Sequence, residues 1–186
     1  MARLSRIRAT CALALLSQFS AAAIATPPAR TVPPQDREYQ VKAAYIFNLL
    51  PFTTWPATAF RSPDAPLNLC IATPNPFGDA LRQTFQSERV GSHPVAIVPI
   101  TSPGAVIDCH VLFIGSDADA TGALEQVAQN APVLTIGESP RFEQRGGMIT
   151  FVIEQGRVRF DLNQTAAARV NLQFSSKVLQ VARNIS

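Results

Sequence analysis

The chain has 186 residues, 47% of them hydrophobic and 16% charged, and a formal net charge of +3. This charge does not indicate nucleic-acid binding, because three of the sixteen basic residues, Arg3, Arg6 and Arg8, lie in a predicted targeting segment. Without that segment thirteen basic residues balance thirteen acidic ones, and no basic run follows. The remaining length fits one ordinary domain with a hydrophobic core.

The first 25 residues have the pattern of a secretory signal peptide. Arginines at the start precede an apolar run from Ala9 to Ala25, which ends in Ala23-Ile24-Ala25, a typical cleavage site. The run has about 17 residues and includes polar ones, whereas a spanning helix needs about 20 apolar residues. We therefore expect cleavage after Ala25 and a function outside the cytoplasm; an uncleaved anchor is the alternative.

A proline-rich segment separates the signal peptide from the domain. Residues 26–35 contain four prolines and almost nothing to bury, which predicts an extended, solvated leader. Residues 36–186 then form a single domain, because the sequence has neither an internal repeat nor a second linker.

The domain opens with a helix predicted over residues 38–50, which Pro51 ends. Apolar residues lie at helical spacing and also fill much of the remaining circumference, so this helix should be buried on more than one side. Strands and helices then alternate. The predicted strands cover residues 67–73, 95–100, 110–114 and 132–136, and the predicted helices cover residues 76–85 and 121–130. This alternation predicts an α/β three-layer sandwich, with a mainly parallel sheet between layers of helices.

The character of the sequence changes towards its C-terminus. Residues 148–153 and 157–162 are two strand-like runs joined by a short turn, in which Gly156 should supply a positive φ. We expect an antiparallel hairpin at one edge of the sheet. Its second strand alternates apolar and charged residues, which predicts one wet face; the charged residues are Arg157, Arg159 and Asp161. A final helix is predicted from about Ser176 to Ile185.

The sequence contains no catalytic or metal-binding pattern. The only histidines, His93 and His110, lack the spacing of zinc ligands, and the G-x-S-x-G nucleophile motif is absent. Gly146-Gly147 precedes a strand instead of opening a helix, the reverse of a phosphate-binding loop. Acidic residues are scattered singly. We expect a protein that is not an enzyme and needs no cofactor or metal.

Two turns leave open a small-ligand site. Gly115-Ser116-Asp117 and Gly137-Glu138-Ser139 follow the two central strands, and open α/β sheets bind ligands at the carboxyl ends of their strands. The same residues are ordinary in any turn between a strand and a helix. An exported small-ligand sensor, binding near Ser116 and Glu138, is therefore an alternative function.

Cys70 and Cys109 are the two cysteines left once Cys11 is removed with the signal peptide. Outside the cytoplasm they can form one intramolecular disulfide, or they can be two free buried thiols. A bond closing a loop of roughly 40 residues would stabilise the fold by about 4 kcal/mol. A catalytic redox pair is disfavoured, because no C-x-x-C spacing is present.

The domain from about Gln35 to Ile185 resembles the YfiR family of periplasmic proteins. The resemblance rests on several segments in order, of which the C-terminal ones are the most specific. They are Val41-Lys42-Ala43-Ala44-Tyr45-Ile46-Phe47-Asn48, Trp55-Pro56, Leu69-Cys70-Ile71, Asn75-Pro76-Phe77-Gly78, Cys109-His110-Val111-Leu112-Phe113-Ile114, Val133-Leu134-Thr135-Ile136-Gly137, Phe142, Arg145-Gly146-Gly147-Met148-Ile149, Val158-Arg159-Phe160-Asp161-Leu162-Asn163, Ala166-Ala167 and Ser175-Ser176-Lys177-Val178-Leu179.

This resemblance implies a non-enzymatic periplasmic regulator. Similar proteins form homodimers and repress an inner-membrane diguanylate cyclase by contacting its periplasmic sensor region, and an outer-membrane lipoprotein can sequester them. Cys70 and Cys109 match the family's disulfide positions. The sequence lacks a second cysteine pair after Pro132, which places any redox regulation by that pair in doubt.

Four residues are candidates for partner binding. Protein interfaces are enriched in aromatic residues and arginine, which favours Arg157 and Arg159 on the wet face of the hairpin, together with Trp55 and Phe142. Trp55 has the alternative of filling the core. The leading hypothesis is therefore a regulator that binds and inhibits the cyclase; a hydrolase or thiol oxidoreductase is a distant third.

Overall fold

The structure is a computed structural model, and it describes residues 33–118 and 121–186. The predicted signal peptide and most of the proline-rich leader lie outside the described residues. Helix α1 spans Pro34–Leu49, so the last two residues of the predicted leader are helical. Pro34 fits there because the first turn of a helix does not use its backbone N–H groups.

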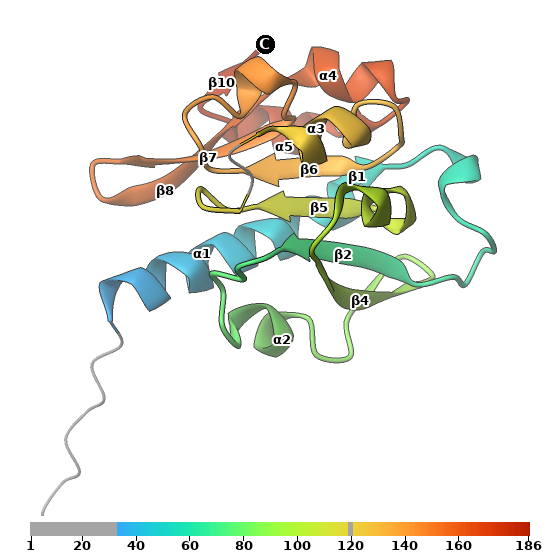
Figure 1. Ribbon diagram of the computed structural model, residues 1–186, viewed down its shortest axis with the longest axis horizontal. Helices are drawn as coiled ribbons and strands as arrows, with labels where there is room; N and C mark the ends of the chain where they lie inside the picture. Colours follow the sequence, from blue (N-terminus) through green and yellow to red (C-terminus); the bar gives the residue numbers. More distant parts are fainter. Residues whose placement is uncertain (1–32, 119–120) are drawn as a thin grey trace, which may run out of the picture. The chain divides into compact units, whose positions relative to one another are not determined.

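A mixed sheet of eight strands forms the centre of the domain, in the order β10-β8-β7-β6-β5-β2-β4-β3 (Figure 1). Strands β4, β2, β5, β6 and β7 run parallel, and β7 and β8 form the predicted antiparallel hairpin. The strands are β2 (Leu67–Ala72), β3 (Arg89–Val90), β4 (His93–Ile100), β5 (Val111–Ile114), β6 (Leu134–Gly137), β7 (Ile149–Glu154), β8 (Arg157–Leu162) and β10 (Asn184–Ile185). The α/β prediction is confirmed.

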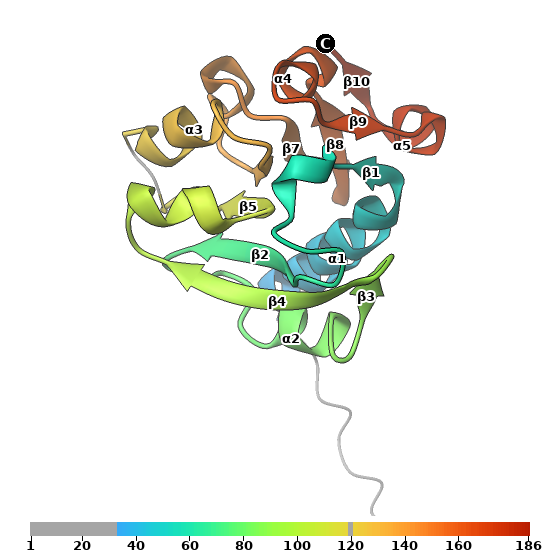
Figure 2. The same ribbon diagram turned by 90° about the vertical axis from the view of Figure 1, so that its right-hand side faces the viewer.

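Helices cover both faces of this sheet (Figure 2). The helical segments are α1, α2 (Ala80–Thr84), α3 (Ala123–Ala128), α4 (Gln164–Arg169), α5 (Ser176–Val181), and the 3-10 turns η1 (Leu50–Phe52), η2 (Ala57–Ala59), η3 (Pro103–Asp108) and η4 (Glu143–Arg145). Strand β5 is buried on both sides: Val111 and Phe113 join the core beneath α1, while Leu112 and Ile114 join a second core beneath α3 and η3. These two cores make the three layers.

A small second sheet fastens the segment after α1 to the C-terminal part of the chain. Strand β1 (Thr53–Thr54) pairs antiparallel with β9 (Gln173–Phe174).

Asn163 caps α4, because its side chain accepts a hydrogen bond from the Ala166 N–H at 2.8 Å.

The hairpin has the expected turn, with φ of 50° at Gln155 and 72° at Gly156. Two consecutive positive φ values fit the twist of a two-residue hairpin. The predicted wet face is wrong at Asp161, which is only 9% exposed. Its carboxylate accepts a hydrogen bond from Arg183 Nε at 2.8 Å, and this pairing covers it.

The predicted last helix is too long. It ends at Val181, and Asn184 and Ile185 instead pair in parallel with Asp161 and Leu162 as β10. Arg183 and Asn184 both donate to Asp161, at 2.8 and 3.1 Å. These bonds, together with the free edge of β8, explain why the chain leaves the helix.

Candidate partner-binding groove

Side chains of α1 line the crevice predicted for a small ligand, which has a volume of about 480 Å³ and is also lined by Ser116 and Glu138. Tyr39 donates to Glu138 Oε1 at 2.8 Å, and the Ser116 backbone N–H donates to the same oxygen at 3.2 Å. Lys42 forms ion pairs with Glu138 and Glu38. Burial, followed by the hydrogen bond to the Glu138 carboxylate, raises the pKa of Tyr39. The Glu138 carboxylate is therefore satisfied within the chain and binds the sheet to α1.

Phe142 is not a surface residue, and its proposed contact with a partner is wrong. It is 1% exposed and belongs to the core beneath α3. A Cβ atom at Gly137 or at Gly147 would lie 2.5 or 2.2 Å from its ring. Because Gly147 has no side chain, the Phe142 ring fits into the core beside it.

Trp55 is half-buried and takes part in internal packing. Its indole Nε1 donates to the His110 carbonyl at 3.1 Å, and its ring lies 6.4 Å from that of Phe60. This arrangement favours the alternative in which Trp55 fills the core.

Both histidines stack on Phe60. The ring centroids of His93 and His110 lie 3.7 and 4.3 Å from that of Phe60. His110 Nδ1 accepts from the Asn68 N–H at 3.0 Å, and its Nε2 lies 3.1 Å from the Ala59 carbonyl. One nitrogen accepts and the other donates, so the ring is neutral. Burial lowers the pKa of His110. Among residues 33–118 and 121–186, no group of three acidic, histidine or cysteine side chains could hold a metal.

Cys70 and Cys109 form a disulfide in the structure, with their Cα atoms 5.8 Å apart. Cys70 lies on β2, and Cys109 lies just before β5, the strand that pairs with β2. The two residues are 1% and 5% exposed. The bond is therefore shielded from solvent, as expected of a structural disulfide.

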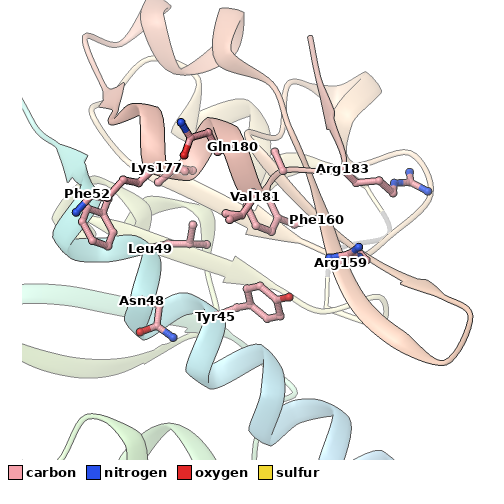
Figure 3. A pocket seen from close by; sticks show the side chains of 12 residues that line it. Tyr45, Asn48, Leu49, Phe52, Arg159, Phe160, Lys177, Gln180, Val181 and Arg183 are labelled. Carbon is pink, nitrogen blue, oxygen red and sulfur yellow. The ribbon is translucent and has the colours of Figure 1, made fainter.

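A groove lies between α1, β8 and α5. Tyr45 of α1 contacts Phe160 of β8, with ring centroids 5.9 Å apart. Figure 3 shows side chains of α1 and α5 converging around Phe160, with Val181 on the α5 side. This part of the groove has a volume of about 640 Å³. A second part, of about 670 Å³, continues beside Val158 towards the tip of the hairpin. Tyr45 and Arg159 line both parts.

The groove explains why the prediction for α1 was only partly right. One side of the helix is buried in the core, but Val41 on the other side is 40% exposed. Val41 and Tyr45 are one helical turn apart and line the groove, and Phe52, 37% exposed, continues this apolar surface. The signal in the sequence was the excess of apolar positions around α1, which indicates a second contact surface.

Basic side chains surround the groove. Arg157 and Arg159 are exposed, as predicted, and line it from β8. Arg37 lines the end near the start of α1, and Lys177 lies over the Phe52 ring at 4.9 Å. None of these four forms an ion pair with another described residue. Among the residues that the structure describes, Glu38 is the one acidic side chain lining the groove, and it shares Lys42 with Glu138.

A three-layer α/β domain with a basic, partly apolar groove has the features of a protein that binds other molecules. Residues 39–183 match the family described as YfiR/HmsC-like, and the chain belongs to this family. Membership suggests a periplasmic regulator of diguanylate cyclase signalling. No curated protein matches the chain.

A solved structure is similar in fold. It is the crystal structure of a conserved domain protein from Vibrio cholerae O1 biovar El Tor strain N16961, with a TM-score of 0.56 and 12% sequence identity. The match covers 80% of this chain and 60% of that one, and it bears on the fold alone. Within the described part of this chain, none of the helices is long and apolar enough to cross a bilayer.

Proposed function

We propose that the protein represses an inner-membrane diguanylate cyclase by binding the cyclase's periplasmic sensor region, and so lowers cyclic di-GMP. The observation that carries this proposal is the position of Arg157 and Arg159. Both are exposed and unpaired among the described residues, beside apolar side chains that are also exposed. Arginine next to exposed apolar surface is the composition of a protein interface, and the family is one of cyclase regulators.

Repression of this kind needs no chemistry from the regulator. A ligand shifts a conformational equilibrium by the difference between its affinities for the two states. A tenfold shift between the active and inactive cyclase requires a difference of about 1.4 kcal/mol. One well-packed contact provides this much, so a small interface is enough to repress.

Deletion of the gene tests the proposal. Cyclic di-GMP and biofilm should rise in the deletion strain and return to the original level when the chain is expressed again. An unchanged level of cyclic di-GMP, under conditions in which the protein is made, would overturn the proposal. Affinity purification from detergent-solubilised envelopes should recover a membrane protein that has a cyclase domain.

The proposal extends to two further contacts implied by the family resemblance. The protein is a homodimer, which light scattering on the purified chain can test. An outer-membrane lipoprotein sequesters it, in which case that lipoprotein should compete with the cyclase for binding. A monomer at micromolar concentration would contradict the homodimer. Simultaneous binding of the lipoprotein and the cyclase to this protein would contradict sequestration.

The small-ligand sensor is the weaker candidate, because Glu138 already bonds to Ser116 and to Tyr39 and Lys42 of α1. A thermal shift screen separates the two functions. A ligand at 100 times its dissociation constant would stabilise the protein by about 2.7 kcal/mol. If no compound in a broad metabolite panel shifts the melting temperature, the result counts against the sensor and favours the regulator.

A further inference from the structure

We infer that the groove between α1, β8 and α5 holds an acidic, amphipathic segment of the cyclase's periplasmic region. This inference rests on the proposed function and names the surface and the chemistry of the contact. The two parts of the groove share Tyr45 and Arg159 as lining residues, so an elongated segment fits along both.

Exposed hydrophobic residues gather along the groove. Among the described residues, seven large hydrophobic side chains are exposed, and four of them line the groove. They are Val41, Phe52, Ile153 and Val181, with exposures of 40, 37, 53 and 57%. Scattered exposed residues need no explanation, but a shared apolar surface marks an interaction site. The segment therefore presents an apolar face to the groove.

The charges that line the groove indicate an acidic partner. Arg37, Arg157, Arg159 and Lys177 line it without a carboxylate partner among the described residues, and they outnumber the one acidic lining residue, Glu38, which shares Lys42 with Glu138. Complementary charge favours correct encounter and disfavours wrong partners. A segment with aspartate or glutamate flanking its apolar face satisfies these four cations.

Other occupants fit less well. In a symmetric contact between two copies the same patch faces itself, so Arg157 and Arg159 would meet like charges. The chain's own residues 1–32 contain four arginines and no acidic residue, so their charge does not match either. An anionic lipid surface matches the charge, but the apolar residues line concavities of about 640 and 670 Å³ and would not insert into a bilayer.

The first test is charge reversal in the full-length chain expressed in the deletion strain. Arg157→Glu with Arg159→Glu should raise cyclic di-GMP to the level of the deletion strain and weaken recovery of the cyclase at least about tenfold. The matched control is Arg141→Glu with Arg169→Glu, which makes the same change of charge at two exposed arginines that do not line the groove. The control should repress like the original chain. Circular dichroism and thermal melts confirm that both variants fold.

The second test maps the contact directly. A photoreactive residue at Val41 or Val181 should cross-link, in intact cells, to a cyclase peptide that contains acidic and apolar residues. One at Ile107, 74% exposed and remote from the groove, should not. Cross-links to lipid, to a second copy, or only from position 107 would overturn the inference.

The two proposals fail in different ways. If deletion raises cyclic di-GMP but the Arg157→Glu, Arg159→Glu chain still represses, the groove inference is wrong and the regulator stands. If deletion changes nothing, the proposed function is wrong.

Discussion

Lys42 and Glu138 form an ion pair in which both side chains are almost fully buried, 4% and 7% exposed. Lys42 lies in the middle of α1, and Glu138 follows β6, so residues 96 positions apart are joined at the carboxyl edge of the sheet. The pair holds the buried side of α1 in place. It thereby also orients the adjoining side of the helix, where Val41 and Tyr45 line the groove.

Removing one member of this pair should be costly. Glu138→Leu should lower the free energy of unfolding by up to about 3 kcal/mol, because Lys42 loses its buried partner and keeps only Glu38, whose side chain is 34% exposed. The double variant Lys42→Met, Glu138→Leu should recover much of that loss, since neither charge remains. Urea denaturation of the three chains measures both values. Equal losses in the single and double variants would show that packing, not charge, is what the pair provides.

Gly147 should not tolerate a side chain. In Gly147→Ala the new Cβ would stand 2.2 Å from the Phe142 ring. The ring is in a tightly packed core, so the variant should lose about 1–3 kcal/mol of stability. Gly104→Ala is the control, because a Cβ there meets nothing within 4 Å. Thermal melts should separate the two; similar midpoints would mean that Phe142 moves aside freely.

Most of the fold could be predicted from periodicity. The continuous runs at residues 111–114 and 133–136 fit strands buried on both faces, and the hairpin followed from two strand-like runs around Gly156. The end of the chain could not be predicted, because Asn184 and Ile185 are exposed and pair only with an edge made elsewhere. Such tertiary pairing overrides the local helical pattern.

The candidate site was predicted less well. Arg157 and Arg159 were found because they alternate with apolar residues on one strand. Phe142 was not recognised as core, because the space for its ring is left by Gly137 and Gly147, and neither helical nor strand periodicity around residue 142 indicates this. The lining by Val41 and Val181 depends on how α1 and α5 are placed beside β8, and single-element periodicity does not contain that information.

The neutral His110 should make stability depend on pH. Burial lowers its pKa in the folded chain below the unfolded value of about 6.5. The unfolded state then binds more protons between the two pKa values, so the contribution is fully present above about pH 6.5 and is lost as pH falls towards the folded pKa. The slope should not exceed about 1.4 kcal/mol per pH unit.

Urea denaturation at a series of pH values between 8 and 5 measures this slope. His110→Gln removes the titrating ring, so its stability should be lower at pH 8 but vary less below pH 6.5. A variant with the same pH dependence as the original chain would assign the effect to other groups.

Cys70 and Cys109 should stabilise the fold without taking part in binding. The bond closes a loop with a sequence separation of 39 and lies beneath α3 and η3, on the face of the sheet opposite α1. Cys70→Ser with Cys109→Ser should lower the free energy of unfolding by about 4 kcal/mol on the chain-entropy model. Below the melting temperature of this variant, repression of the cyclase should persist, because the groove is built from other elements. Denaturation of the purified variant and cyclic di-GMP in the complemented strain give the two readouts. Loss of repression in a variant that is still folded would instead assign the bond a regulatory role.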